Sequence, residues 1–421
     1  MLITTAALLL SLTNASSAAP PNPWPPRRFS ISAWCAPPVA YTNLTTYQAM
    51  EHAGLTLVMP PLGQAPTVTE NLHILDLCRA CHMQAIIADA RMPAGMSSAG
   101  ATAAVASIAK DYAHQPALLG YFLADEPGAD AFANEGSVIA AFRRADPSHI
   151  VYVNLFPNYA TTNLQRPQSQ LQTNTYHGYV TKFAAEARPW LISWDYYTLL
   201  ISHDRNGFFS NLAECRTDAA AAGLPFWQIV LSTQILSYRS PTLAELRFQA
   251  LQTLAYGAHG LLWFTWWPPD SQGLKSSHDV VDATGKPAAL FGDISTVDAE
   301  TSEIARWLYT ALSLQVYQTG DIPAGGNPQP PDAMAFTTSK TNWTIGVFRG
   351  GDGFVYVLAA NRDYTAPATM DLSLESNGDP VQMLDLHNDR WVSAAGKPDD
   401  NNNMVVPITA GPGDAVLLRW Q

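Results

Sequence analysis

Basic residues are scarce in this chain. Only 14% of its 421 residues are charged, and 23 Lys and Arg stand against 35 Asp and Glu, which gives a formal net charge of −12. Nucleic acids and anionic membranes are bound by basic surfaces, so neither is an expected partner. The low charge favours a neutral or weakly polar ligand instead.

The chain also lacks an apolar run of the ~18 to 20 residues that a transmembrane helix needs. Its apolar segment Leu2–Leu12 is short, and small residues follow it up to Pro20. This pattern is typical of a secretory signal peptide, so we expect residues 1–19 to be removed and the protein to be secreted. The sequons that begin at Asn43 and Asn342 fit a glycoprotein on that route.

Cysteine is rare as well. The four cysteines permit at most two disulfides in an exported protein. Cys78, Cys81 and His82 stand close enough in sequence for a metal site, but no second ligand pair follows at zinc spacing. No His-Glu-x-x-His pair is present either. We therefore expect buried thiols or a disulfide, and neither a metal nor another cofactor.

Short apolar segments alternate with helical stretches through most of the chain. The eight expected strands are residues 29–35, 55–59, 84–90, 118–127, 150–156, 190–196, 225–231 and 260–266. Eight such βα units predict a (β/α)8 TIM barrel of the α/β class. A doubly wound open sheet gives the same local pattern, but Ala36-Pro-Pro38 stands where its Gly-rich dinucleotide turn belongs.

The pattern changes at residues 318–331, which are rich in Gly and Pro and typical of a linker. Beyond them, short β-type segments separated by turn signals predict a small antiparallel β-sandwich. We therefore divide the chain into a signal peptide (1–19), a catalytic barrel (27–317), a linker (318–331) and a C-terminal sandwich (332–421).

Candidate site residues follow from the rule that barrel active sites lie at the carboxyl ends of the strands. The fourth strand ends in Asp125 and Glu126 just before Pro127. The other polar or aromatic residues at strand ends include Trp34, Asp89, Asn154, Asp195, Tyr196, Tyr197, Gln228, Trp263 and Trp266. Acids and amides bind hydroxyl groups, and indole rings cover the apolar face of a sugar, so we expect a carbohydrate ligand. Side chains alternate along a strand, so only one of the last two Trp is expected to form a sugar platform.

These strand-end residues resemble those of a known family of enzymes. With Asp125-Glu126-Pro127 on the fourth strand and a Trp-rich eighth strand after residues 254–260, the chain resembles the clan of (β/α)8 retaining glycoside hydrolases that includes β-galactosidases and cellulases. In that clan the fourth strand ends in Asn-Glu, and the Glu is the acid/base. The resemblance implies glycosidase activity and this role for Glu126. Asp125 replaces the Asn that contacts the sugar 2-hydroxyl, which leaves its role open.

The seventh strand departs from the clan, which places its nucleophilic Glu there. Residues 225–232 contain no carboxylate, and Gln228 or Ser232 occupies that neighbourhood. Two acids are needed, because one protonates the leaving oxygen while the other face of the sugar is attacked or stabilised. Asp195 on the sixth strand is the best substitute, followed by Asp125 and Asp89.

Three alternatives remain. The missing Glu is compatible with a non-catalytic carbohydrate-binding barrel. An acid on the fourth strand with Asp195-Tyr196 on the sixth also resembles substrate-assisted barrels of the chitinase type, although their repeated acidic motif is absent. A triad of Ser232, His203 and Asp195 would make an esterase, but no Gly-x-Ser-x-Gly elbow supports it.

Overall fold

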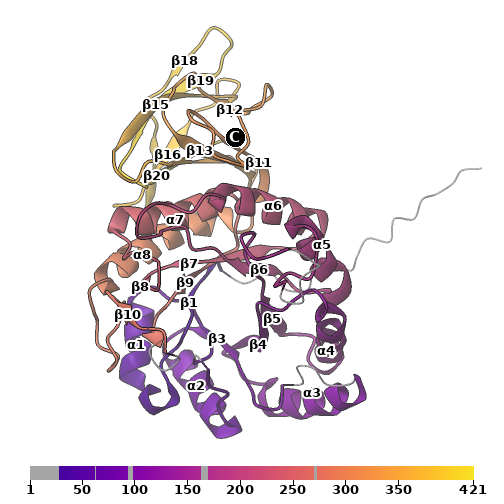
Figure 1. The fold of residues 1–421 in the computed structure, drawn as a ribbon. Coiled ribbons are helices and arrows are strands. Elements are labelled where there is room, and N and C mark those ends of the chain that lie inside the picture. Colours follow the sequence, from indigo (N-terminus) through magenta and orange to yellow (C-terminus); the bar gives the residue numbers. More distant parts are fainter. Residues whose placement is uncertain (1–27, 62, 93–97, 163–168, 270–272) are drawn as a thin grey trace, which may run out of the picture.

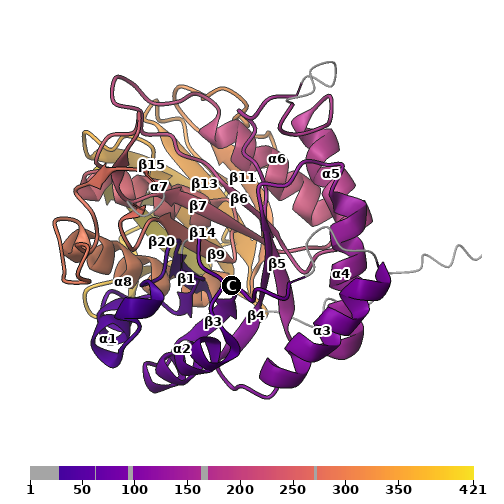
Figure 2. The same cartoon turned by 60° about the horizontal axis from the view of Figure 1, so that its bottom comes forward.

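The barrel and the sandwich predicted from the sequence are both present (Figures 1 and 2). The computed structural model describes residues 28–421 apart from 62, 93–97, 163–168 and 270–272. The expected signal peptide, residues 1–19, lies outside the described residues. No helix in the described part of the chain is long and apolar enough to cross a membrane.

Eight parallel strands form the barrel in chain order. One half contains β2 (Leu57–Val58), β3 (Gln84–Ile87), β4 (Leu118–Asp125) and β5 (Ile150–Asn154), and the other contains β6 (Ile192–Asp195), β7 (Phe226–Leu231), β9 (Gly260–Phe264) and β1 (Ser30–Ala33). A bridge between Leu155 and Trp194 joins β5 to β6. On the other side, the Thr56 amide donates to the Ile31 carbonyl at 2.8 Å and joins β1 to β2. The barrel therefore closes, with β9 as its eighth strand.

Helices surround the barrel in an outer ring (Figure 2). They are α1 (Leu44–His52), α2 (Val68–Ala80), α3 (Ser98–Tyr112), α4 (Phe132–Ala145), α5 (Tyr176–Ala187), α6 (Phe208–Ala221), α7 (Leu243–Ala255) and α8 (Phe291–Leu308), with a short 3-10 turn at Val39–Tyr41. Three of them begin with a capping box, in which Asn43 pairs with Thr46, Thr67 with Glu70 and Thr242 with Glu245. These caps satisfy amide groups that the first turn leaves free, so the sequence itself marks where each helix begins.

Large aromatic side chains fill the barrel interior. The Trp34 ring meets Phe122 edge to face at 5.7 Å, and Tyr152 lies 6.0 Å from Trp227 between ring centres. Residues such as Trp263 instead face the helices, where its indole N–H donates to Asp298 of α8 at 2.8 Å. The strands are buried on both faces, which explains their continuous apolar runs.

The C-terminal domain is an antiparallel sandwich of two sheets. The first sheet contains β11 (Leu312–Gln318), β13 (Trp343–Arg349), β14 (Val355–Asn361), β20 (Ala415–Trp420), β16 (Gln382–Asp385) and β17 (Arg390–Ser393); the second contains β12 (Ala335–Phe336), β15 (Ala368–Leu374), β19 (Met404–Ala410) and β18 (Lys397–Pro398). A two-stranded antiparallel sheet of β8 (Gln234–Ile235) and β10 (Ser276–Ser277) lies apart from them, beside the barrel. The sandwich packs over α6 and α7 in Figure 1. The packing is close, because a Cβ on Gly346 would lie 2.2 Å from the Ala255 carbonyl oxygen of α7.

The start of the sandwich differs from the expected boundary at residue 332. Strand β11, which we expected within the barrel domain, pairs antiparallel with β13. The expected linker after it is attached to the domain as well, since the Gln318 amide donates to the Asn327 carbonyl at 2.6 Å. The Pro and Gly content of residues 318–331 indicated a segment with little regular structure. It did not reveal that the segment is hydrogen-bonded to the sandwich.

The four cysteines are free and buried, in agreement with the expectation of buried thiols. Among the described residues, no group of three or more His, Cys, Asp or Glu is arranged to hold a metal ion.

Candidate active site

Two adjacent carboxylates stand where β4 ends. A register shift interrupts β4 between Phe122 and Ala124, and Glu126 then adopts a φ of 48°. A left-handed backbone costs a non-glycine residue of order ~1 kcal/mol. The irregularity breaks the strand alternation, so that Asp125 and Glu126 both turn toward the neighbouring strands β5 and β6. The Glu126 amide is held there by the Asn154 carbonyl at 2.8 Å.

Asn154 of β5 joins the acids of its two neighbours. Its side-chain nitrogen donates to Asp125 at 3.1 Å and to Asp195 of β6 at 3.0 Å. Asn154 and Asp195 are buried, Glu126 is partly buried, and Asp125 is exposed. The arrangement is therefore a small polar cluster at the carboxyl ends of three consecutive strands, open to solvent at Asp125.

Burial controls the proton affinity of the cluster. It raises the pKa of Asp195 well above its usual value, and the charges of Glu126 and then Asp125 raise it further. Burial, helped by the charge of Asp125, raises the pKa of Glu126 to about 7, while a hydrogen bond between Glu126 and Asp195 opposes that rise. Desolvation by the surrounding protein raises the pKa of Asp125 as well, even though part of its side chain is exposed, and a hydrogen bond from Asn154 opposes that rise. Near neutral pH the cluster thus holds a proton that it can donate.

Aromatic rings form the floor below the acids. Tyr152 lies two residues before Asn154 on β5, and its hydroxyl is 2.8 Å from that of Ser193, two residues before Asp195 on β6. Because side chains alternate along a strand, these residues share the inward face with the acids. The Trp34 ring contacts Tyr152 at 6.3 Å from the end of β1.

A second set of aromatic residues stands beside the acids on the loops that follow β5, β6 and β7. We name Tyr159, Tyr197, Tyr238 and Arg205 the mouth wall. The Tyr197 and Tyr238 rings meet edge to face at 5.5 Å, and the Arg205 guanidinium lies 3.9 Å from the Tyr159 ring centre. Sequence reasoning collected Tyr197 as a strand-end residue but missed Tyr159, Arg205 and Tyr238, because loop residues give no periodic signal.

Five expected binding residues face away from the acids. The Tyr196 hydroxyl donates to the Asn206 carbonyl, and the Gln228 side chain accepts a hydrogen bond from Thr253 of α7. The Trp263 indole donates to Asp298, and Trp266 packs against Phe291 of α8. Asp89 binds Arg91 and Tyr112. Tyr196 and Gln228 follow inward residues on their strands, so alternation turns them outward. The two Trp side chains are 0% and 1% exposed, so neither presents the free ring face that a sugar platform needs.

No acid faces the cluster from β7. Its inward positions, in phase with Trp227, are Ile229 and Leu231, and Leu231 packs against Leu199 and Ile235. The esterase triad is not assembled: Ser232 donates to the Thr265 carbonyl, while His203 pairs with Ser202 at the surface.

A cavity of about 520 Å³ lies at the other end of the barrel. Its lining includes Arg216, Phe226, His259 and Leu312, and contains no carboxylate. Phe226 begins β7, so the cavity lies at the amino ends of the strands, where barrel active sites are not found. We therefore assign the candidate active site to the acid cluster.

Comparisons with known proteins give similarity of structure. No family model matches the sequence, and no curated protein matches it either. A solved structure described as a glycoside hydrolase has a TM-score of 0.60 at 10% identity and covers 94% of this chain and 92% of its own. A family 5 glycoside hydrolase from Bacteroides vulgatus has a TM-score of 0.61 at 10% identity, covering 94% and 89%. At such low identity the likeness concerns the fold, and it confirms the fold of the clan that the sequence resembles.

Proposed function

We propose that the protein is a glycoside hydrolase that cleaves O-glycosidic bonds, with Glu126 as the proton donor and Asp195 as its carboxylate partner. One observation carries this proposal: Asp125, Glu126 and Asp195 meet at the carboxyl ends of β4 and β6, and the pKa of Glu126 is raised to about 7. A neutral carboxyl group is what must protonate a leaving alkoxide. The glycoside hydrolase fold of the structural neighbours supports the same reaction class.

The reaction would use each member of the cluster differently. Glu126 gives its proton to the glycosidic oxygen as the C–O bond breaks. The Asp195 carboxylate stabilises the positive charge that develops on the sugar ring, and a water molecule then adds to the anomeric carbon and returns a proton to Glu126. Asp125 raises the pKa of Glu126 through its charge, and Asn154 positions both aspartates.

The second candidate is a substrate-assisted reaction of the chitinase type. The opposite wall, β7, carries Ile229 and Leu231 in place of an acid. The attacking group would then be an acetamido oxygen of the substrate, and Asp125 or Asp195 would orient it.

We also propose that the protein is secreted and acts on a neutral glycan or glycoside. The apolar N-terminal segment and the net charge of −12 support this. Asn43 is exposed at the start of α1, which fits its use as a glycosylation acceptor. Appearance of the protein in the medium of a eukaryotic host, with a mass decrease after removal of N-glycans, is the expected result; retention in the cell would contradict it.

The experiment that tests the function is a screen of chromogenic glycosides and glycan mixtures with the wild-type protein and Glu126→Gln. We expect release of sugars by the wild type and none above background by the variant. Activity restricted to 2-acetamido sugars would select the substrate-assisted reaction. Undiminished activity of Glu126→Gln would contradict the assignment, and saturable binding without turnover by the wild type would select the non-catalytic barrel.

The matched control is Glu135→Gln. Glu135 is a buried glutamate of α4 whose pKa burial also raises to about 7, but no contact joins it to the cluster in the described part of the chain. We expect this variant to keep the wild-type activity.

A further inference from the structure

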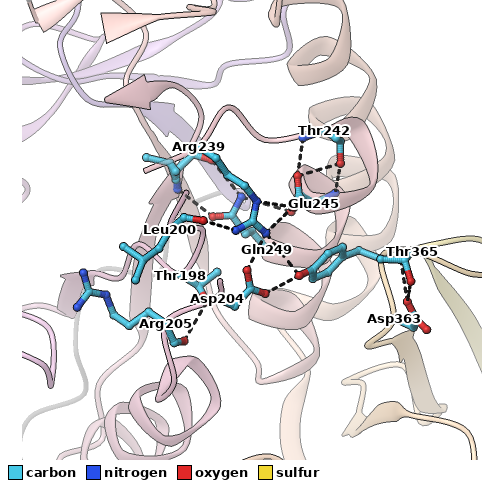
Figure 3. Close-up of polar contacts among 12 residues, drawn as sticks. Thr198, Leu200, Asp204, Arg205, Arg239, Thr242, Glu245, Gln249, Asp363 and Thr365 are labelled. Carbon is cyan, nitrogen blue, oxygen red and sulfur yellow. Dashed lines mark hydrogen bonds and ion pairs between the residues drawn. The ribbon is translucent and has the colours of Figure 1, made fainter. Parts of the chain in front are cut away.

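The loop after β6 carries a cation beside the acid cluster. Arg205 is partly buried, and its guanidinium stacks on the Tyr159 ring at 3.9 Å. Its Nη2 donates to the Tyr238 hydroxyl at 3.2 Å, and its Nε donates to the Tyr197 carbonyl at 3.3 Å. In Figure 3 the side chains of Arg205 and its neighbour Asp204 point in opposite directions, so Asp204 does not neutralise it.

Other arginines on this face of the barrel are each matched by two carboxylates. Arg91 binds Asp89 and Asp111, and Arg239 binds Asp204 and Glu245. Arg205 forms no ion pair with any residue that the structure describes. A partly buried charge without a counter-charge is unfavourable, and the stacking on Tyr159 offsets only part of that cost. The guanidinium is therefore available to an anionic group from outside the chain.

Arg205 lies close to the acid cluster. Asp195 ends β6, and Tyr197 follows it by two residues, with a ring centre 5.0 Å from Phe264 of β9. Tyr159 lies on the loop after β5, and its pKa is raised by burial and then by the charge of Asp195, while Arg205 opposes the rise. The Tyr159 ring is thus close to both the cluster and the guanidinium. A sugar that reaches Glu126 lies within a short distance of the mouth wall.

We infer that Arg205 binds the oxyanion of an acidic substituent, a carboxylate or a sulfate ester, on an otherwise neutral glycan. The inference rests on the proposed function, because the glycan is taken to be the ligand of the cluster. Tyr159 covers one face of the guanidinium, and Nε and Nη2 already donate to Tyr197 and Tyr238, so Nη1 is the nitrogen without a hydrogen-bond partner among the described residues and can donate to an oxygen of such a group. The cation also offsets the repulsion between an acidic sugar and the ionised members of the acid cluster.

The test uses the full-length Glu126→Gln protein on an array of oligosaccharides printed in matched sets. Each set contains a hexuronic acid, the corresponding neutral hexose, or the same hexose with a sulfate ester. We expect one acidic form to bind at least about tenfold more tightly than its neutral counterpart, and the preferred form identifies the anion. Adding Arg205→Met should weaken that binding roughly 10- to 100-fold, and Arg205→Lys should weaken it less.

Controls separate charge recognition from damage to the loop. Arg144 is exposed on α4, and Arg144→Met in the same background should change nothing. The melting temperature and the binding of the neutral counterpart should be unchanged in Arg205→Lys. Equal binding of acidic and neutral forms, no glycan binding at all, or acidic binding that persists in Arg205→Met would each overturn the inference.

The experiment distinguishes a failure of the Arg205 inference from a failure of the proposed function. If the wild type hydrolyses neutral glycans and shows no preference for acidic ones, the glycosidase proposal stands and the Arg205 inference fails. If acid-selective binding depends on Arg205 but the wild type hydrolyses none of the bound glycans, the inference stands and the proposed activity fails.

Discussion

The side-chain nitrogen of Asn154 lies 3.0 Å from Oδ1 of Asp195. The same nitrogen reaches Asp125 at 3.1 Å, whereas the amide oxygen of Asn154 has no hydrogen-bond partner among the described residues. The side-chain amide of Asn154 therefore positions the carboxylates of Asp125 on β4 and Asp195 on β6. This arrangement links the ends of β4, β5 and β6, with Asp125 exposed, Glu126 partly buried and Asp195 buried.

Replacement of Asn154 by alanine should change the pH dependence of activity. Its hydrogen bonds lower the pKa values of Asp195 and Asp125, so their loss should raise both. The acidic limb of the pH–rate profile should then move to higher pH, and kcat/KM should fall roughly 10- to 100-fold. The control is Asn71→Ala, which removes a buried amide bonded to the Ala88 carbonyl of the barrel wall. It should lower the melting temperature without moving the profile, and an unmoved limb in Asn154→Ala would contradict the positioning role.

Two buried aspartates give a matched test of the second carboxylate. Burial raises the pKa of both Asp195 and Asp298 well above the usual value, but Asp298 binds Trp263 on the outer side of the barrel. Asp195→Asn should lower kcat about 100-fold or more, because it removes the carboxylate that assists the acid. Asp298→Asn should leave kcat unchanged. Full activity of Asp195→Asn on the wild type's best substrate would reject Asp195 as a catalytic group.

The stability of the protein should depend on Glu126 at neutral and alkaline pH. Its folded pKa of about 7 lies above the ordinary value of 4.5, so the folded state binds this proton more tightly than the unfolded state does. The contribution to stability is fully present below pH 4.5 and is lost as the pH rises through 7. Glu126→Gln, which stays neutral, should therefore be more stable than the wild type at pH 8 by on the order of 1 to 3 kcal/mol, and similar to it at pH 4.

Urea unfolding at the two pH values measures this difference. Glu135→Gln should show the same gain at pH 8, since burial raises the pKa of Glu135 to about 7 as well. Only Glu126→Gln should combine the gain with loss of activity. A gain confined to pH 4 would contradict the sign of the Glu126 pKa shift.

The barrel was predictable because its strands are buried on both faces. Burial requires continuous apolar runs such as residues 118–123, and the polar residues that end those runs mark the open end of the barrel. Asp125, Glu126, Asn154 and Asp195 were found in this way, and the structure brings them together.

The direction of side chains was harder to predict. Tyr196, Gln228 and Trp263 lie near strand ends, yet alternation turns them to the helices. Their orientation depends on the phase of each strand, which a short apolar run does not reveal. Arg205 and Tyr159 lie on irregular loops, and only the folded chain brings them together.

The C-terminal sandwich contributes one side chain to a loop beside the mouth wall, which allows a last test. The Tyr364 hydroxyl donates to Asp204 at 2.6 Å, and Arg239 binds the other oxygen of Asp204 at 2.6 Å (Figure 3). Asp204 directly precedes Arg205, so this network fixes the backbone from which the Arg205 side chain extends. Tyr364→Phe removes one hydrogen bond to a charged group, of about 1.5 to 3 kcal/mol, and should loosen the loop.

We expect Tyr364→Phe to raise KM severalfold while kcat stays close to that of the wild type, because the loop is proposed to bind the substrate away from the breaking bond. Tyr356→Phe is the matched control, since the Tyr356 hydroxyl also donates to an aspartate, Asp352, at 2.6 Å, but within the sandwich. Both variants should lose some thermal stability. Only Tyr364→Phe should alter KM, and an equal KM in the two variants would show that the sandwich does not act on the loop through this bond.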